Sequence, residues 1–206
     1  SLPVAKIYDF SENHGTIVLE DLGDTILRDV LLKSDPEKRD ELLNDAIILI
    51  ARIQAATPKA FELNSIASRL KFDEEKLLWE LNFFREHYFE SYKKQPLSPE
   101  ENERLISEFT EIARELESCA DVLCHRDFHA ANLMLDQKNK LRIIDHQDAR
   151  LGSVTYDLVS LLLDRILEMP EKYWLNEKKK FFLAEREKLG LAKIEFEKFN
   201  YEFDLQ

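Results

Sequence analysis

The sequence predicts an α+β fold in which long helices dominate and short strands form a small hairpin region. Apolar residues recur with the 3.6-residue period of an amphipathic helix over several long stretches. Two of these stretches follow proline-containing helix starts. The apolar pieces 133–135 and 141–144 flank the polar turn DQKNK, which is typical of a hairpin.

One strand followed by a series of helices is expected along the chain. Residues 16–20 (TIVLE) are rich in β-branched side chains and predict a strand that has no visible partner. SDPE at 34–37 predicts a helix start, with Ser34 or Asp35 as the cap and Glu37 placed for a capping box. SPEE at 98–101 repeats this start. The expected helices cover 25–32, 34–56, 73–92, 98–118, 155–168, 170–189 and 192–206; residues 121–124 are expected to be extended and 145–153 to form a loop.

Composition limits the partners that we expect. The 206 residues suffice for one large domain or two small ones, and they carry a net charge of −12. An acidic surface repels phosphate backbones and anionic lipids, so neither nucleic acid nor a membrane is expected as a partner. No secretory signal is visible at the N-terminus, and Cys119 and Cys124 match no zinc-binding pattern. We therefore expect a cytoplasmic protein with two reduced thiols.

The stretch HRDFHAANLML at 125–135 carries the strongest chemical signal. Transfer of a phosphoryl group from a nucleotide needs a carboxylate that orients and deprotonates the acceptor hydroxyl, and oxygen ligands for Mg²⁺. Asp127 can be the base, and Asn132 and Asp145 can be the metal ligands, because a hairpin between them would return the chain to the same place. HRDxxxxN followed by an aspartate after a short strand is typical of kinase-like catalytic loops. A polar turn that merely caps local backbone is the alternative.

The segments around this motif resemble the aminoglycoside phosphotransferase superfamily of small-molecule kinases. DHQDARLGSVTYDLVSLLLD at 145–164 leads directly into a helix and contains no protein-kinase-like activation segment. The text of 125–134 and 144–162 looks most like the kinases that phosphorylate N-acetylmuramate and N-acetylglucosamine at the anomeric hydroxyl. WELNFFREHY at 79–88 and VLEDLGD at 18–24 are also similar to segments of that branch.

The resemblance implies a protein-kinase-like fold and the use of ATP and Mg²⁺. Residues 1–22 would be the end of the small lobe and the hinge strand, and residues 23–206 the helical large lobe. Asp127 would then be the catalytic base, with Asn132 and Asp145 holding Mg²⁺. The backbone at Glu20, Asp21 and Leu22 would contact adenine.

Further residues receive roles from their positions near these motifs. Glu80 lies in an apolar helix segment, and its carboxylate needs a partner, either a sugar group or an arginine. His129 could contact the substrate or pack the loop, and Arg126 is expected to be exposed or in a local ion pair. The candidate substrate-binding residues are Glu80, His129, Asp148 and Arg150, and the residues expected to shape the loop are His125 and Asp157.

The parts of a kinase that grip phosphate are not visible in this chain. Its four glycines build neither GxGxxG nor GxxxxGK[ST]. Lys6 in PVAKIY is too close to the hinge strand to be the phosphate-binding lysine, since no helix glutamate fits between them. We therefore expect that most of the small lobe is absent, that the C-terminus also ends early, and that these 206 residues alone are inactive. An aminoglycoside- or choline-type phosphotransferase and a noncatalytic kinase-like binding module stay open as alternatives.

Overall fold

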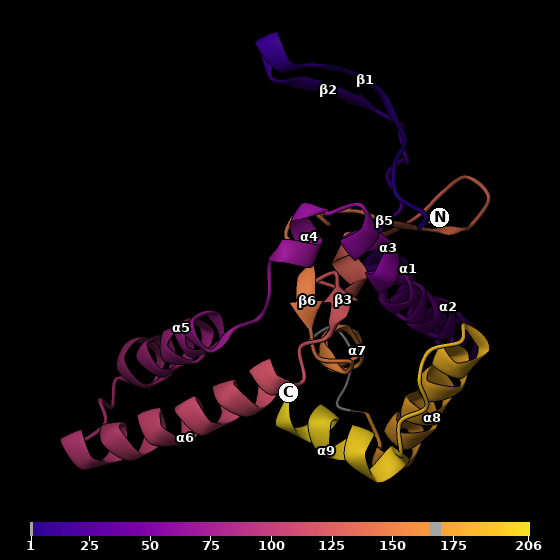
Figure 1. The fold of residues 1–206 in the computed structure, drawn as a ribbon. Helices are drawn as coiled ribbons and strands as arrows, with labels where there is room; N and C mark the ends of the chain where they lie inside the picture. Colours follow the sequence, from indigo (N-terminus) through magenta and orange to yellow (C-terminus); the bar gives the residue numbers. More distant parts are fainter. Residues whose placement is uncertain (1, 165–169) are drawn as a thin grey trace.

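A computed structural model describes residues 2–164 and 170–206 of the chain, and it is built mostly of helices (Figure 1). The helical elements are α1 (Leu27–Leu31), α2 (Pro36–Ala55), α3 (Thr57–Glu62), α4 (Ile66–Arg69), α5 (Glu74–Arg85), the π-helical η2 (Glu86–Tyr92), α6 (Pro99–Ser118), α7 (Tyr156–Leu162), α8 (Lys172–Lys188) and α9 (Phe196–Leu205), with short 3₁₀ turns η1 (Glu12–His14) and η3 (Ala130–Asn132). The strands are β1 (Ile7–Ser11), β2 (Thr16–Leu19), β3 (Val122–Cys124), β4 (Leu133–Leu135), β5 (Leu141–Ile143) and β6 (Arg150–Gly152).

The strands of the described residues form three separate antiparallel pairs, β1–β2, β3–β6 and β4–β5. The predicted hairpin at 133–144 is confirmed as β4–β5. Asp136 closes its turn, because Oδ1 accepts the backbone N–H groups of Lys138 and Lys140 at 2.8 and 3.0 Å. Bridges from Val4 to Ile143 and from Ile26 to Met134 tie the hairpin to the N-terminal segment.

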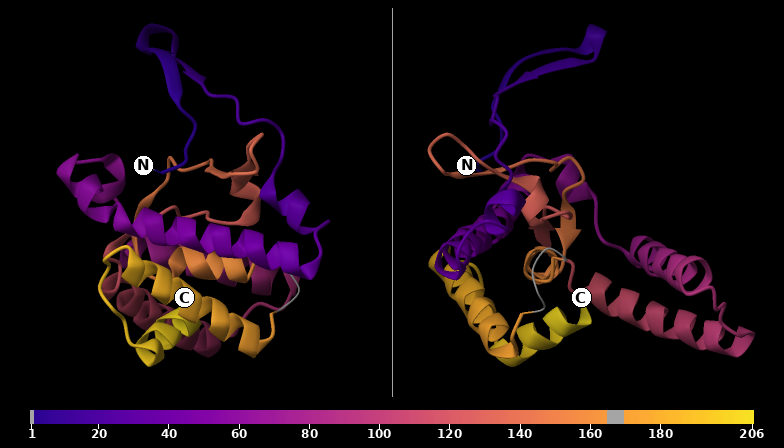
Figure 2. Two further views of the ribbon diagram at one scale, coloured as in Figure 1. Left: turned by 90° about the vertical axis from the view of Figure 1, so that its right-hand side faces the viewer. Right: turned by 180° about the vertical axis from the view of Figure 1, so that it is seen from behind.

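The expectation that the strand at 16–20 lacks a partner is wrong. It pairs with β1 through a turn in which Gly15 has a φ of 58°. The sequence of β1, IYDFS, alternates apolar and polar residues from Tyr8 to Ser11, a short strand signal that the sequence reasoning did not use. The ribbon projects from the rest of the molecule (Figures 1 and 2) with both apolar faces exposed. Two strands alone bury little apolar surface, so such a ribbon is only marginally stable by itself.

Helix α2 crosses the centre of the main core and packs along α8 (Figure 2). Its cap differs from the capping box that the sequence predicts. Asp35 is the N-cap and accepts the N–H of Lys38 at 2.8 Å, which leaves Glu37 one position too early to complete the box. Helix α6 has the full capping box of Ser98 and Glu101.

Three further differences concern short elements. Strand β6 lies where a loop was expected, because its partner β3 is about thirty residues away and three residues carry no period of their own. Helices α3 and α4 were not predicted, and the predicted helix 73–92 ends in a π-helical turn. Of the helix predicted at 155–168, α7 ends at Leu162, and 165–169 lie outside the described residues.

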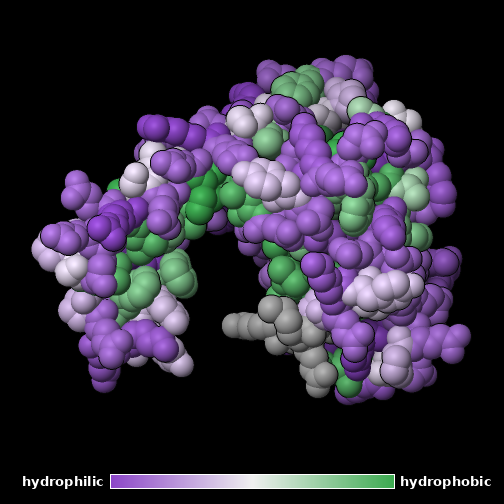
Figure 3. Space-filling model, turned by 90° about the horizontal axis from the view of Figure 1, so that it is seen from below, coloured by the Kyte–Doolittle hydropathy of each residue, from purple (hydrophilic) through white to green (hydrophobic). Residues whose placement is uncertain are grey.

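Helices α5 and α6 lie side by side and leave the body as an arm. A deep hollow separates this arm from the remaining helices, and apolar side chains gather along the arm's inner side and at the base of the hollow (Figure 3). The small core cluster of Phe72, Leu77, Ala113 and Leu116 fixes the base of the arm. Neither residues 2–164 nor residues 170–206 contain a helix that combines the length and the apolar character of a membrane span.

Candidate active site

The loop that carries the HRD motif is anchored from below by α7. Asp157 is fully buried, and its two oxygens accept the backbone N–H groups of His125 at 2.8 Å and Arg126 at 3.1 Å. Burial raises the pKa of this carboxyl to about 7, although both N–H groups favour the charged form. The two hydrogen bonds that Asp157 accepts from the backbone of His125 and Arg126 are the contacts expected of a residue that anchors the loop.

His125 joins the same loop to the segment before Asp145. Its ring is buried, and Nε2 donates to the carbonyl of Ile144 at 2.8 Å. Desolvation lowers the pKa of the ring, so the neutral form is favoured and Nε2 carries its proton. Within the described residues, Nδ1 is buried without a hydrogen-bond partner.

The structure brings Asp127, Asn132 and Asp145 together. Asn132 Nδ2 donates to the backbone carbonyl of Asp127 at 3.0 Å and to Asp145 Oδ2 at 3.3 Å. Because these bonds use Nδ2, they leave Oδ1 of Asn132 open. Asp145 has a φ of 61°, uncommon for a residue other than glycine, and its Oδ1 accepts a hydrogen bond from Gln147 at 2.7 Å.

This pair of side chains fits a magnesium ion. A carboxylate and a carboxamide supply hard oxygen donors, and Mg²⁺ keeps water and phosphate oxygens as its remaining ligands. The part of the chain that the structure describes holds no cluster of three His, Cys, Asp or Glu side chains able to bind a metal. A carboxylate and a carboxamide would therefore suit Mg²⁺ better than zinc.

A cleft of about 420 Å³ lies beside Asp127, where the arm joins the body. Leucine and isoleucine side chains of α5 and α6 form one wall, and α7 and α9 form the other. The polar lining consists of Glu80, Arg126, Asp127, Tyr156, Ser160 and Gln206. Burial raises the pKa of Tyr156, and the carboxylate of Glu80 adds to this, so its hydroxyl stays a hydrogen-bond donor.

One of the four candidate substrate residues lines this cleft. Glu80 does, with Lys76 Nζ at 3.6 Å and Arg126 Nη2 at 3.9 Å from its Oε1. The other three lie outside its lining. His129 faces Asn132, Arg150 packs its guanidinium over the ring of Phe72, and Asp148 pairs with Arg126 and Arg150.

The predicted hinge is held by an ion pair that sequence reasoning missed. Arg142 on β5 contacts both carboxylate oxygens of Glu20, at 2.7 and 3.3 Å. The hydrogen bond from Arg142 lowers the pKa of Glu20. In the same segment the backbone N–H of Glu20 is bonded to the carbonyl of Lys6 at 2.8 Å, and the side chain of Asp21 accepts the N–H of Gly23 at 2.8 Å. One signal for this ion pair was present in the sequence, because Arg142 is a charged residue within the apolar segment LRII at 141–144.

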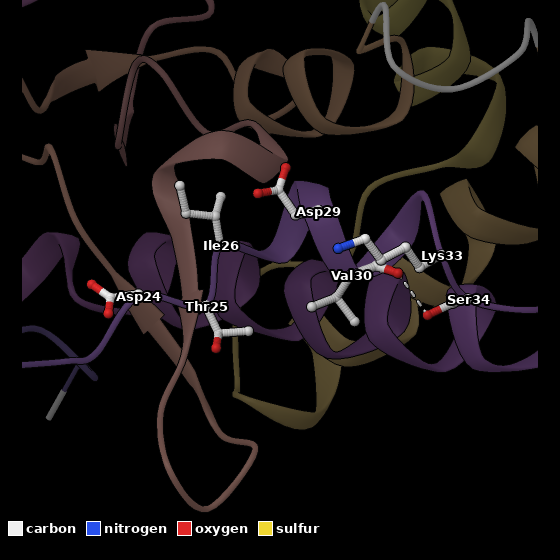
Figure 4. A pocket seen from close by; sticks show the side chains of 7 residues that line it. All are labelled: Asp24, Thr25, Ile26, Asp29, Val30, Lys33 and Ser34. Carbon is white, nitrogen blue, oxygen red and sulfur yellow. Dashed lines mark hydrogen bonds between the residues drawn. The ribbon is translucent and has the colours of Figure 1, made fainter.

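A second cavity, of about 340 Å³, follows the hinge (Figure 4). Its lining begins at Asp24 and continues along α1 to Ser34, whose hydroxyl donates to the carbonyl of Val30 at 2.8 Å. It shares no residue with the cleft at Asp127. Within the described residues, one cavity therefore follows the predicted hinge, and a separate one lies beside Asp127.

The sequence of the chain matches a known family. The family model described as "Phosphotransferase enzyme family" matches residues 1–189. The chain belongs to this family.

Two curated relatives are each named "N-acetylmuramate/N-acetylglucosamine kinase". The one from Neisseria meningitidis is 30% identical over 174 residues, which is 84% of this chain. The one from Pseudomonas aeruginosa is 31% identical over 180 residues, 83% of this chain. Each match covers 50% of the relative, so the chain spans about half the length of these proteins.

Solved structures confirm the fold. The complex of gentamicin with APH(2″)-IIa superposes with a TM-score of 0.53 at 18% identity, covering 92% of this chain and 64% of that one. ADP-bound aminoglycoside phosphotransferase APH(2″)-Ib gives 0.51 at 17% identity, covering 100% of this chain and 75% of that one. The choline kinase LicA from Streptococcus pneumoniae gives 0.50 at 12% identity, covering 99% and 75%. The predicted kinase-like fold is therefore confirmed.

Proposed function

We propose that the full reading frame containing this chain encodes an ATP- and Mg²⁺-dependent kinase of a small sugar. Its acceptor would be the anomeric hydroxyl of N-acetylmuramate or N-acetylglucosamine. The observation that carries the proposal is the placement of Asp127 between the Asn132–Asp145 pair and a partly apolar cleft. The two curated relatives, which are named for these sugars, support this choice of acceptor.

In this proposal each residue has a defined task. The backbone at Glu20, Asp21 and Leu22 would contact adenine. Asn132 and Asp145 would hold Mg²⁺, which neutralises phosphate charge when bound. Asp127 orients the sugar hydroxyl and accepts its proton as the oxygen attacks the γ-phosphorus. The bond from that phosphorus to the β,γ-bridging oxygen breaks, and ADP leaves.

The charges in the cleft disfavour a cationic acceptor. Glu80 already has a protein cation of its own, because Lys76 Nζ lies 3.6 Å from its Oε1. The remaining acid in the lining is Asp127, which is reserved for the proton. An aminoglycoside or choline would therefore find no unpaired carboxylate besides the base. The leucine-rich wall suits the methyl of an acetamido group.

The test measures ADP release by the protein made from the full reading frame with Mg-ATP. N-acetylmuramate, N-acetylglucosamine, choline and kanamycin are compared, with Asp127→Asn as the blank. We expect turnover on the acetylated sugars alone. Asp127→Asn should lower it by at least about 10²-fold while leaving the circular dichroism spectrum unchanged.

Other outcomes would redirect the proposal. Turnover on kanamycin or choline alone would overturn the acceptor but keep the kinase. Absence of turnover with all four acceptors would favour the noncatalytic binding module. We expect the 206-residue segment alone to be inactive, because its described residues offer no phosphate-binding lysine or glycine loop.

A further inference from the structure

Arg126, between His125 and the proposed base, has an unusual backbone. Its φ is 87°, a value that side chains other than glycine rarely adopt. The buried carboxylate of Asp157 holds this conformation by accepting the N–H of Arg126 at 3.1 Å. Backbone strain that the surroundings enforce in this way is concentrated at functional sites.

The guanidinium of Arg126 lies among three carboxylates that come from three different parts of the fold. Asp148, after the metal-ligand loop, is hydrogen-bonded to Nη1 at 3.0 Å. Asp127 Oδ2 and Glu80 Oε1 each lie 3.9 Å from a guanidinium nitrogen, beyond hydrogen-bond distance. A shift of about 1 Å would thus turn the contact with Asp127 into a direct salt bridge.

Asp148 is itself fixed from the other side. Its backbone carbonyl accepts a hydrogen bond from Arg150 Nε at 3.1 Å, and its Oδ1 lies 3.7 Å from Arg150 Nη2. Arg150 in turn lies over the buried ring of Phe72, 5.3 Å from its centroid. Asp148, the counter-ion of Arg126, is therefore held in place by Arg150, which packs on Phe72.

We propose that Asp148 is a positioning residue that holds Arg126 away from the base, so that Asp127 stays free to take the acceptor proton and Arg126 presents its remaining N–H donors to the sugar. This inference rests on the proposed kinase function. It explains why a strongly basic side chain can lie beside a general base without neutralising it. It also gives Asp148 a role that requires no contact with the substrate.

The proposal makes Asp148 and Arg126 interdependent, which a double-mutant cycle measures in the full-length protein. Asp148→Ala should lower kcat about 10- to 100-fold with KM within threefold, because the freed guanidinium closes on Asp127. Arg126→Met should mainly raise the acceptor KM, by about 10-fold, through lost donors. The double variant should equal Arg126→Met alone, since no guanidinium remains to block the base.

Conservative and distant variants separate this role from a merely structural one. Asp148→Glu keeps a counter-ion and should retain more activity than Asp148→Ala. Arg114→Met on α6 removes an exposed arginine that pairs with Glu74 at 3.1 Å, and it should match the parent protein. Multiplicative losses in the double variant, or an unaffected Asp148→Ala protein, would overturn the proposal.

A crystal structure of the full-length Asp148→Ala protein tests the same idea without turnover. We expect the Arg126 guanidinium to lie within hydrogen-bond distance of Asp127. A guanidinium that keeps its 3.9 Å separation, or turns to Glu80 or to solvent, would refute the role of Asp148. Inactivity of the parent protein on every acceptor would instead count against the kinase function, and the crystal structure would still decide the inference.

Discussion

Replacing Asp157 by asparagine changes the one side chain that anchors the catalytic loop. Both carboxylate oxygens accept backbone N–H groups, from His125 and Arg126. In the Asp157→Asn variant an NH₂ group replaces one of these oxygens, so one buried N–H loses its acceptor. The expected cost is about 1 to 3 kcal/mol of unfolding free energy.

The pH dependence of this cost follows from the raised pKa of Asp157. The carboxyl ionises at its ordinary 3.8 in the unfolded chain and at about 7 in the folded one. Because the folded state binds the proton more tightly, the stability from this group is complete below about pH 4 and is lost as the pH rises through about 7. Between about pH 5 and about pH 8 the parent protein should lose about 2 to 3 kcal/mol that the variant does not lose.

Urea unfolding of both full-length proteins at these two pH values measures the difference. Relative to the parent, the variant should be about 2 to 3 kcal/mol more stable at the higher pH than at the lower one. Exposed Asp121→Asn is the matched control and should show the same difference at both. If the stability difference for Asp157→Asn is equal at both pH values, to within about 0.5 kcal/mol, the reasoning from burial is refuted.

Three further predictions test the metal ligands and the packing. Asp145→Asn should raise the Mg²⁺ concentration for half-maximal turnover by about 10-fold or more, since the site loses its one formal charge; an unchanged requirement would remove Asp145 from the site. Gln54→Leu should cost about 2 to 4 kcal/mol in urea unfolding, because buried Gln54 accepts from Arg186 Nε and donates to the Val154 carbonyl, both at 2.8 Å; exposed Gln95→Leu is its control. Gly152→Ala should cost about 1 to 3 kcal/mol, because a Cβ there would lie 2.9 Å from Cys124 Sγ and 3.0 Å from Phe72 Cδ2; unchanged stability would show that the sheet yields freely.

The sequence by itself determined the elements whose signals are local. Caps and helical periodicity located α2 and α6 to within two residues, and a polar turn between two apolar pieces located the β4–β5 hairpin. The HRDxxxxN motif selected Asp127 and Asn132 as candidates, and the aspartate after the next short strand added Asp145, because phosphoryl transfer needs a base and oxygen ligands for Mg²⁺. Each of these signals lies within about twenty neighbouring residues.

The tertiary structure alone decided what depends on contacts between distant segments. Strand β6 exists because β3 lies beside it, and three residues cannot indicate a partner about thirty positions away. Glu80, on the arm, and Arg126 face the same cleft, although 46 positions separate them in the sequence. Whether a charged side chain pairs, anchors or stays open is a matter of less than an ångström, as the 3.0 and 3.9 Å contacts of Arg126 show. Distances of that kind are set by packing, which no local pattern encodes.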